Sequence, residues 1–453
     1  MNALRDLEAP SYAARNALLF DRQVRDNGGA IWNGRPLGLL EAPIRIYHPA
    51  FARILSCMAA PLEDHRFSSE ELDTASFLIN ALAPYYRDED ERIVAIKGLE
   101  LCSPPGPKAL LLLAEVKNGI GEGDRDAVML AAYEYVALAV SDELQAPREK
   151  SCLPALILAI VGEHVVIYGA VLLDGKPVVQ RLTSLVTLGA TENIRTHPLT
   201  GNPDRIECGR SRIDEGTLHA ARVLRALRDG VEALERYYSA SASAPLPPPG
   251  TLRCHPYLTT LTSAEHGTLA LQYTARLAEF DASRAVFKAR MTVGEAGEKV
   301  DVAVKFTHSY HRSAHALLAG LSPPLAPRLW HCARAEDVGM CVVVMDFIDC
   351  ADKWRARGTQ DDEYVGTLRA AIGALHERDW VYGDLRLSNV LPAEDGIKLI
   401  DFGWCGSVGE ARYPSDVNLN PGVIGWHHGV QRGGLIEKEH DRHMFKVVTG
   451  REF

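Results

Sequence analysis

The sequence predicts an α+β protein of two domains. Its 453 residues are enough for two or three domains. Residues 239–250 are alanine- and serine-rich and then proline-rich, which predicts an extended linker without core-forming capacity. Both flanking segments mix short apolar runs with helical periodicity. We therefore expect a partly irregular lead-in at 1–42, a first domain at 43–238 and a second domain at 251–453.

The composition is that of an ordinary soluble globular protein, with 47% hydrophobic and 24% charged residues. The net charge of −10 argues against an indiscriminate nucleic-acid or membrane binder. Nine cysteines without a C-x-x-C pair argue against a structural zinc site or a disulfide framework, and favour a reducing compartment. The N-terminal residues do not resemble a signal peptide, and no apolar run approaches about 18 residues. We expect an intracellular protein, cytoplasmic or nuclear, without membrane contact.

The first domain begins with helical patterns and continues with apolar runs. Proline and glycine in the connector at 102–107 stop both neighbouring runs, which predicts a hairpin-like turn between two strands. Leu224, Leu227, Val231 and Leu234 recur at intervals of three and four, as in an amphipathic helix. The expected elements are two helices within 51–86 separated by Pro61, strands at 92–101 and 109–116, a helix at 124–140, strands at 153–161, 165–173 and within 178–188, a loop at 189–212, and a long helix at 213–238.

The second domain begins with strand-like runs and becomes more helical. The expected elements are a small antiparallel sheet at 269–306, a helix at 309–321, a strand at 342–347 leading into a hinge at 346–349, a helix at 363–378 and a short strand at 397–400. This order places the polar motifs of residues 380–406 after the sheet, in the helical half.

Residues 380–406 carry the strongest functional signal. Asp384 is followed by Asn389 and then by Asp401-Phe402-Gly403. Phosphoryl transfer from ATP uses one carboxylate to accept the proton of the attacking hydroxyl, and an amide with a second carboxylate to hold Mg²⁺. Upstream, Lys305 ends the predicted strand from Val302, where its ammonium could contact phosphates or snorkel to solvent.

Together these residues resemble the protein-kinase signature. The resemblance implies a bilobal fold in which Asp384 is the catalytic base, while Lys305, Asn389 and Asp401 bind ATP. It also implies that Asn389 and Asp401 hold the metal. Arg386 would add positive charge near the transferring phosphoryl group.

The sequence departs from that signature in several places. Residues 278–284 contain no glycine where a glycine-rich loop is expected, so backbone amides cannot approach phosphates closely. The helix after Lys305 lacks the usual glutamate, so an Asp or Glu from elsewhere, such as Asp401, is expected to orient the lysine. Tyr382-Gly383 replaces His-Arg, and only 52 residues follow Asp401 (453 − 401), which predicts a shortened helical lobe. An active phosphotransferase and a nucleotide-binding pseudokinase both remain open.

Three further sets of polar residues have two interpretations each. Asp441 is either a buried brace for the catalytic-loop backbone or an exposed helix carboxylate. His308, His311 and His315 follow i, i+3, i+7 spacing, which suits either a metal site or packing of a helix near the lobe junction. His440 and His443 allow the same two readings.

Glu115-Val116-Lys117 ends an apolar strand in the first domain. Residues i and i+2 of a strand face the same side, so the carboxylate and the ammonium point into one site. Metal-dependent phosphodiester cleavage uses this pair, with the carboxylate on Mg²⁺ and the lysine on the attacking water. Glu100 is the expected second metal ligand, with Glu91 and Asp90 as alternatives. An exposed ion pair at a strand end is the competing interpretation.

The order of elements around Glu115 and Lys117 resembles the PD-(D/E)xK restriction-endonuclease-like α/β fold. The whole chain, including Arg412-Tyr413-Pro414, Trp426 and His440-Asp441, resembles the fungal-type protein-kinase-like proteins and crinkler-type effectors. The resemblance implies an ATP- and Mg²⁺-dependent phosphotransferase with an appended nuclease-like module. The alternative is a pseudokinase that controls a metal-dependent nuclease or toxin. ATP and a hydroxyl acceptor, with protein favoured, are the expected partners, and nucleic acid is a candidate partner of the first domain.

Overall fold

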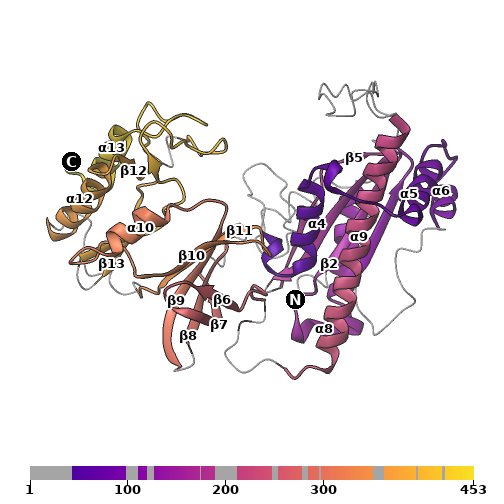
Figure 1. Cartoon of the computed structure of the whole chain (residues 1–453), viewed down its shortest axis with the longest axis horizontal. Helices are drawn as coiled ribbons and strands as arrows, with labels where there is room; N and C mark the ends of the chain where they lie inside the picture. Colours follow the sequence, from indigo (N-terminus) through magenta and orange to yellow (C-terminus); the bar gives the residue numbers. More distant parts are fainter. Residues whose placement is uncertain are drawn as a thin grey trace, which may run out of the picture. The chain divides into compact units, whose positions relative to one another are not determined.

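The computed structural model describes residues 43–97, 111–119, 127–173, 175–188, 212–246, 252, 254–277, 284–294, 297–349, 362–393, 396–420 and 424–453. The chain is α+β and divides into two compact units (Figure 1). The first unit extends to Tyr257, and the second takes in Leu258–Ala278 and Ala285–Phe453.

A five-stranded sheet forms the centre of the first unit. Its strands are β1 (Leu112–Lys117), β2 (Ala155–Val161), β3 (His164–Leu173), β4 (Lys176–Arg181) and β5 (Val186–Thr187). The order is β1-β2-β3-β4, with β5 pairing β3, and only β1 and β2 run parallel within this sheet. Between them lie α7 (Ala127–Ala139) and the short α8 (Gln145–Lys150). β2 and β3 are buried along almost their whole length because they are apolar on both faces.

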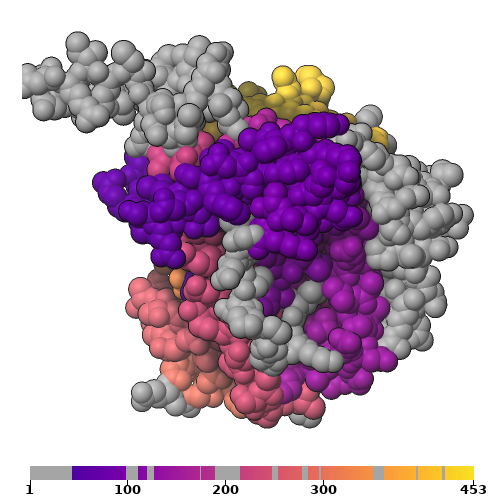
Figure 2. All heavy atoms as spheres, turned by 90° about the vertical axis from the view of Figure 1, so that its right-hand side faces the viewer, coloured from indigo at the N-terminus to yellow at the C-terminus, as the bar shows by residue number. Residues whose placement is uncertain are grey.

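Four further helices complete this unit: α4 (Pro49–Ala59), α5 (Ser69–Leu82), α6 (Glu89–Ile96) and α9 (Arg212–Ser243). Both α4 and α5 pack along α9 (Figure 1). In the space-filling view, residues 43–97 (indigo) form a continuous part of the surface (Figure 2). Residue 44 and α4 also pack closely against β3 at Gly169. A Cβ at Gly169 would lie 2.5 Å from Ile44 Cδ1 and 2.8 Å from Phe51 Cδ1, so this contact requires glycine.

The two predicted helices within 51–86 and the two long strands are confirmed, but the strand predicted at 92–101 is wrong for its first part. Residues up to Ile96 belong to α6 instead. Asp88 caps this helix by accepting a hydrogen bond from the backbone N–H of Glu91 at 3.0 Å. Arg92 then donates to the carbonyls of Leu82 and Gly162, both at 3.0 Å, which fixes the helix. The turn expected at 102–107 lies outside the described residues, as does most of the loop expected at 189–212.

The linker prediction is wrong at its beginning, because α9 continues to Ser243. Alanine has the highest helix propensity of all residues, which offsets the serines between. Lys150 caps the end of the helix by donating to the carbonyls of Ser241, Ala242 and Ala244 at 3.1, 2.9 and 2.7 Å. The strand predicted within 178–188 is two short strands, β4 and β5.

The second unit begins with a six-stranded antiparallel sheet. Its strands are β6 (Thr260–Ser263), β7 (Gly267–Arg276), β8 (Val286–Val293), β9 (Glu298–Thr307), β10 (Leu329–Ala335) and β11 (Met340–Asp346). Their order is β10-β11-β9-β8-β7-β6. Lys305 lies on β9, between Val286 of β8 and Val343 of β11. The helix α10 (Arg312–Ala319) connects β9 to β10.

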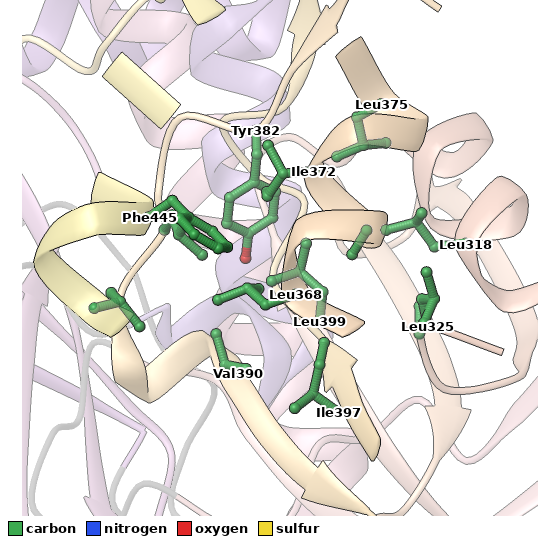
Figure 3. Packing of buried hydrophobic residues seen from close by; sticks show 14 of the residues in the cluster. Leu318, Leu325, Leu368, Ile372, Leu375, Tyr382, Val390, Ile397, Leu399 and Phe445 are labelled. Atoms are coloured by element: carbon green, nitrogen blue, oxygen red, sulfur yellow. The ribbon is translucent and has the colours of Figure 1, made fainter. Parts of the chain in front are cut away.

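The rest of the second unit is organised by α12 (Asp362–His376) and α13 (Lys438–Thr449). Leu368, Ile372 and Leu375 form the buried face of α12 as predicted, and they pack with Tyr382 and Phe445 (Figure 3). Short antiparallel pairs flank this core: β12 (Trp380–Val381) with β15 (Gly406–Ser407), and β13 (Val390–Ala393) with β14 (Gly396–Leu399).

His308, His311 and His315 do not share one helix face, because α10 begins only at Arg312. His311 caps the helix by accepting a hydrogen bond from the backbone N–H of Ala314 at 3.0 Å. His315 is fully buried. In the described part of the chain, no three His, Cys, Asp or Glu side chains gather to hold a metal ion. Packing therefore explains His315 better than metal binding.

Candidate active site

Lys305 and Asp401 form an ion pair, with 2.5 Å between Lys305 Nζ and Asp401 Oδ1. The helix α10 that follows β9 contains no acidic residue, so the expected substitution of Asp401 for the usual glutamate is present. Asp401 has a φ of 64°, in the left-handed region that non-glycine residues adopt rarely. Strained backbone of this kind clusters at ligand and catalytic sites. The Lys305 side chain is 16% exposed and the Asp401 side chain 32%, so both remain within reach of a ligand.

Asp384, Arg386 and Asn389 form a second cluster. The amide nitrogen of Asn389 donates to the backbone carbonyl and to Oδ2 of Asp384, both at 2.9 Å. Arg386 Nε lies 2.6 Å from Asp384 Oδ1, and Arg386 Nη2 donates to Oδ2 at 2.7 Å. Burial raises the pKa of Asp384, and the Asp401 charge raises it further, while Arg386 opposes both effects.

The two clusters are joined through the backbone, where the N–H of Ile400 donates to the carbonyl of Asn389 at 3.0 Å. The residue that donates is the one directly before Asp401. Four side chains widely separated in sequence, Lys305, Asp384, Asn389 and Asp401, are thus connected by short contacts in one unit.

Asp441 braces the loop that carries Asp384, and the exposed-carboxylate alternative is excluded. The side chain is 1% exposed. Its two oxygens accept hydrogen bonds from the backbone N–H groups of Tyr382 and Gly383, each at 2.8 Å. Oδ2 also lies 3.0 Å from His376 Nε2 on α12. Gly383 has a φ of 82°, and a Cβ there would lie 2.8 Å from Ile436 Cδ1. Glycine therefore suits the position where the kinase signature has arginine.

Phe402 is the centre of a ring stack that sequence reasoning missed. Its ring lies 5.0 Å from that of His315, nearly parallel, and 5.7 Å from that of Tyr382, edge to face. His315 Nε2 bonds the carbonyl of Pro327 at 2.7 Å. The backbone N–H of His311 donates to the carbonyl of Phe402 at 3.0 Å. The segment around α10 is therefore attached to the Asp401-Phe402-Gly403 turn through rings and backbone rather than through a glutamate.

The donor set suits ATP with Mg²⁺. Magnesium prefers oxygen ligands, which a carboxylate and an amide oxygen supply. The Asn389 amide nitrogen makes both bonds to Asp384, and neither of these bonds uses the amide oxygen. Residues 278–283, where the glycine-rich loop was expected, lie outside the described residues.

The first unit contains a separate polar cluster at the end of β1. Lys117 is 6% exposed, and its Nζ lies 3.3 Å from Glu115 Oε1 and 2.8 Å from Glu89 Oε1. Burial raises the pKa of Glu115, with the neighbouring Glu134 of α7 adding to the effect. Glu115 and Lys117 therefore share one site, and the exposed-pair interpretation is wrong.

Glu100, the expected second ligand, lies outside the described residues. Of the alternatives, Glu91 pairs with Arg87 at 3.0 Å instead. Glu89, at the first position of α6, takes the place beside Lys117. Asp88 is a residue type that often caps helices, and it directly precedes Glu89. The strand predicted at 92–101 left no place for a helix that begins there.

No family model matches the sequence. Among solved structures, the chain has a distant match to the kinase PK-1 of Cydia pomonella granulovirus, with 16% sequence identity and a TM-score of 0.26. The match covers 36% of this chain and 64% of the viral chain, slightly less than two thirds of that protein's length. Within the described ranges, the helices are all too short or too polar to cross a membrane.

Proposed function

We propose that the second unit is an ATP- and Mg²⁺-dependent phosphotransferase of the protein-kinase type. The observation that carries the proposal is the Lys305–Asp401 ion pair at 2.5 Å, connected to the Asp384–Asn389 pair at 2.9 Å. Four groups that phosphoryl transfer requires are thereby gathered from β9, the loop before β13 and the turn after β14. The backbone brace from Asp441 favours a preorganised loop.

Each residue has a role that follows from its chemistry. The Lys305 ammonium binds phosphate oxygens, and its pairing with Asp401 positions it. Asp384 accepts the proton of the acceptor hydroxyl as the new O–P bond forms, and its raised pKa improves it as a base near neutral pH. Asn389 and Asp401 would hold Mg²⁺, which would supply positive charge to neutralise the phosphates. The Arg386 guanidinium pairs with the Asp384 carboxylate in this structure. It is therefore placed to release that carboxylate and bind a phosphoryl oxygen instead.

Label transfer from γ-labelled ATP tests the assignment, with the protein itself and a generic protein as acceptors. We expect Asp384→Ala to abolish transfer. Asp379→Asn is the matched control, because the Asp379 side chain is 84% exposed and pairs with Lys438 at the surface. Asparagine also tolerates the φ of 54° at that position. Transfer that survives Asp384→Ala at the wild-type rate would refute the role of Asp384. Nucleotide-induced thermal stabilisation without any transfer would support the pseudokinase alternative instead.

The first unit favours a second candidate function, metal-dependent cleavage of phosphodiesters by a PD-(D/E)xK-type site. The specific observation is the buried Lys117 in contact with both Glu115 and Glu89. A lysine is seldom buried unless it is paired, and here it is paired with the acidic side chains that a divalent cation would also use.

Nicking of supercoiled DNA and cleavage of single-stranded RNA with Mg²⁺ or Mn²⁺ test this function. We expect Lys117→Ala to lose cleavage while Lys97→Ala keeps it, because Lys97 is exposed at the end of α6. Far-UV circular dichroism separates lost chemistry from lost folding. Equal cleavage, or equal toxicity on expression, by the Lys117→Ala variant and the wild type would contradict the proposal.

A further inference from the structure

Two cysteines face each other across neighbouring strands of the second unit. Cys332 lies on β10 and Cys341 on β11, with 4.0 Å between their sulfur atoms. Cys332 pairs in register with Val343, and Cys341 with Arg334. The two thiols are therefore diagonal neighbours on one face of the sheet, since Cys341 and Val343 are two residues apart on a strand.

The same face of the sheet carries Lys305. On the other side of β11, Val343 pairs with Lys305 and Cys341 pairs with Thr307 of β9. Cys332, Val343 and Lys305 thus form one row across three strands. A change in the spacing of β10 and β11 on this face would be transmitted through one residue to the lysine of the candidate active site.

The two thiols are also unequal in reactivity. The hydrogen bond from the Cys332 thiol lowers the pKa of Cys341 to about 7 and raises that of Cys332. Cys341 is partly exposed, whereas Cys332 is buried. A partly exposed, low-pKa thiol next to a second thiol is the arrangement of a redox-sensitive pair. By contrast, burial raises the pKa values of Cys57 and Cys405, so these thiols stay protonated.

We propose that Cys332 and Cys341 form a reversible dithiol–disulfide switch whose oxidant is a hydroperoxide. The Cys341 thiolate attacks the terminal peroxide oxygen, the O–O bond breaks, and the leaving oxygen takes a proton to depart as water or an alcohol. The sulfur of Cys332 then attacks the resulting sulfenic acid and displaces its hydroxyl, which leaves as water with the Cys332 proton. The two sulfurs lose two electrons in total, and the peroxide gains them.

Oxidation draws the sulfur atoms from 4.0 Å to about 2.05 Å, a change the strands must absorb. If the second unit is the phosphotransferase proposed above, the displaced row moves Lys305 away from its position opposite Asp401. The oxidised form then binds the nucleotide more weakly, by about fivefold or more.

Peroxide treatment of the full chain, followed by alkylation, digestion and mass spectrometry, tests the chemistry directly. We expect a cross-linked peptide pair joining Cys332 to Cys341, reversed by dithiothreitol, while Cys57 and Cys405 remain alkylated. Cys332→Ser should stop at the sulfenic acid of Cys341, which a dimedone probe traps. Separate alkylation of both thiols after peroxide treatment would overturn the proposal.

Binding of a non-hydrolysable ATP analogue with Mg²⁺ to the reduced and oxidised forms tests the consequence. The wild type should bind about fivefold more weakly when oxidised, and Cys332→Ser should bind equally in both conditions. Equal affinity of the two wild-type forms would overturn the regulation, with the disulfide itself judged by the peptide mapping. Absence of binding even in the reduced form would instead overturn the phosphotransferase function.

Discussion

Asp441→Asn gives the sharpest test of how the candidate active site is held together. The wild-type carboxylate accepts two backbone N–H groups at 2.8 Å and contacts His376 at 3.0 Å, all in the interior. Asparagine keeps one acceptor oxygen and replaces the other with an NH₂ group. One backbone N–H then loses its acceptor and faces another donor.

The magnitude follows from these contacts. Leaving a buried N–H without its acceptor costs about 1–3 kcal/mol, and the surviving bond loses the charge that strengthened it, about 1 kcal/mol more. We therefore expect the free energy of unfolding of the second unit to fall by about 2–4 kcal/mol. Label transfer should fall as well, because the loop bearing Asp384 is no longer fixed.

Urea unfolding followed by tryptophan fluorescence measures the effect. Five of the six tryptophans, Trp330, Trp354, Trp380, Trp404 and Trp426, follow Leu258, so the signal reports mainly on the second unit. Glu439→Gln is the control on the same helix, because Glu439 is 60% exposed and pairs with Arg442 at the surface. The Glu439→Gln substitution should change the free energy of unfolding by no more than about 0.5 kcal/mol. An Asp441→Asn variant as stable as Glu439→Gln would refute the account of the brace.

Three further predictions concern ionisable groups. Burial lowers the pKa of His315 from 6.5 to about 4, so the unfolded state binds the proton more tightly than the folded state. The contribution of His315 to stability is complete above pH 6.5, and the free energy of unfolding falls by about 3 kcal/mol as the pH drops to about 4. Urea titrations at each pH should show this loss in the wild type and not in His315→Leu. Glu71→Gln should destabilise the first unit by about 1–2 kcal/mol in far-UV circular dichroism, because Glu71 of α5 accepts two hydrogen bonds at 2.7 Å from Arg225 of α9; an unchanged midpoint would contradict this. Arg386→Ala should move the acidic limb of label transfer to higher pH, because Arg386 holds down the pKa of Asp384; an unmoved limb would show that the ion pair does not act on the base.

Most of the fold of the second unit could be predicted because its signals are local. The apolar face of α12 repeats at helical spacing, and Val302–Lys305 reads directly as a strand. The pairing of Lys305 with Asp401 could also be inferred, since no acidic residue lies in α10. For these features the sequence offers few alternatives, so the residue types alone are enough to predict the element or the ion pair.

The contacts that were missed depend on register and on competition between local signals. The proximity of Cys332 to Cys341 requires knowing that Cys332 pairs with Val343, which no local pattern specifies. Residues 92–96 of α6 were predicted as strand because of their apolar run, whereas they belong to a helix that Asp88 caps. That one error removed Glu89 from the candidates near Lys117.

The departures from the kinase signature at residues 382 and 383 are compatible with the proposed site for a physical reason. Asp441 contacts the backbone of both residues, so the brace does not depend on which side chains they carry. The Tyr382 ring packs edge to face on Phe402. By contrast, Asp384 and Asn389 contact each other through their side chains, and these are the residues that the sequence retains. The chain therefore departs from the kinase signature where the contact is made through the backbone. It matches the signature at the side chains that, in the proposed site, would contact the nucleotide and the metal.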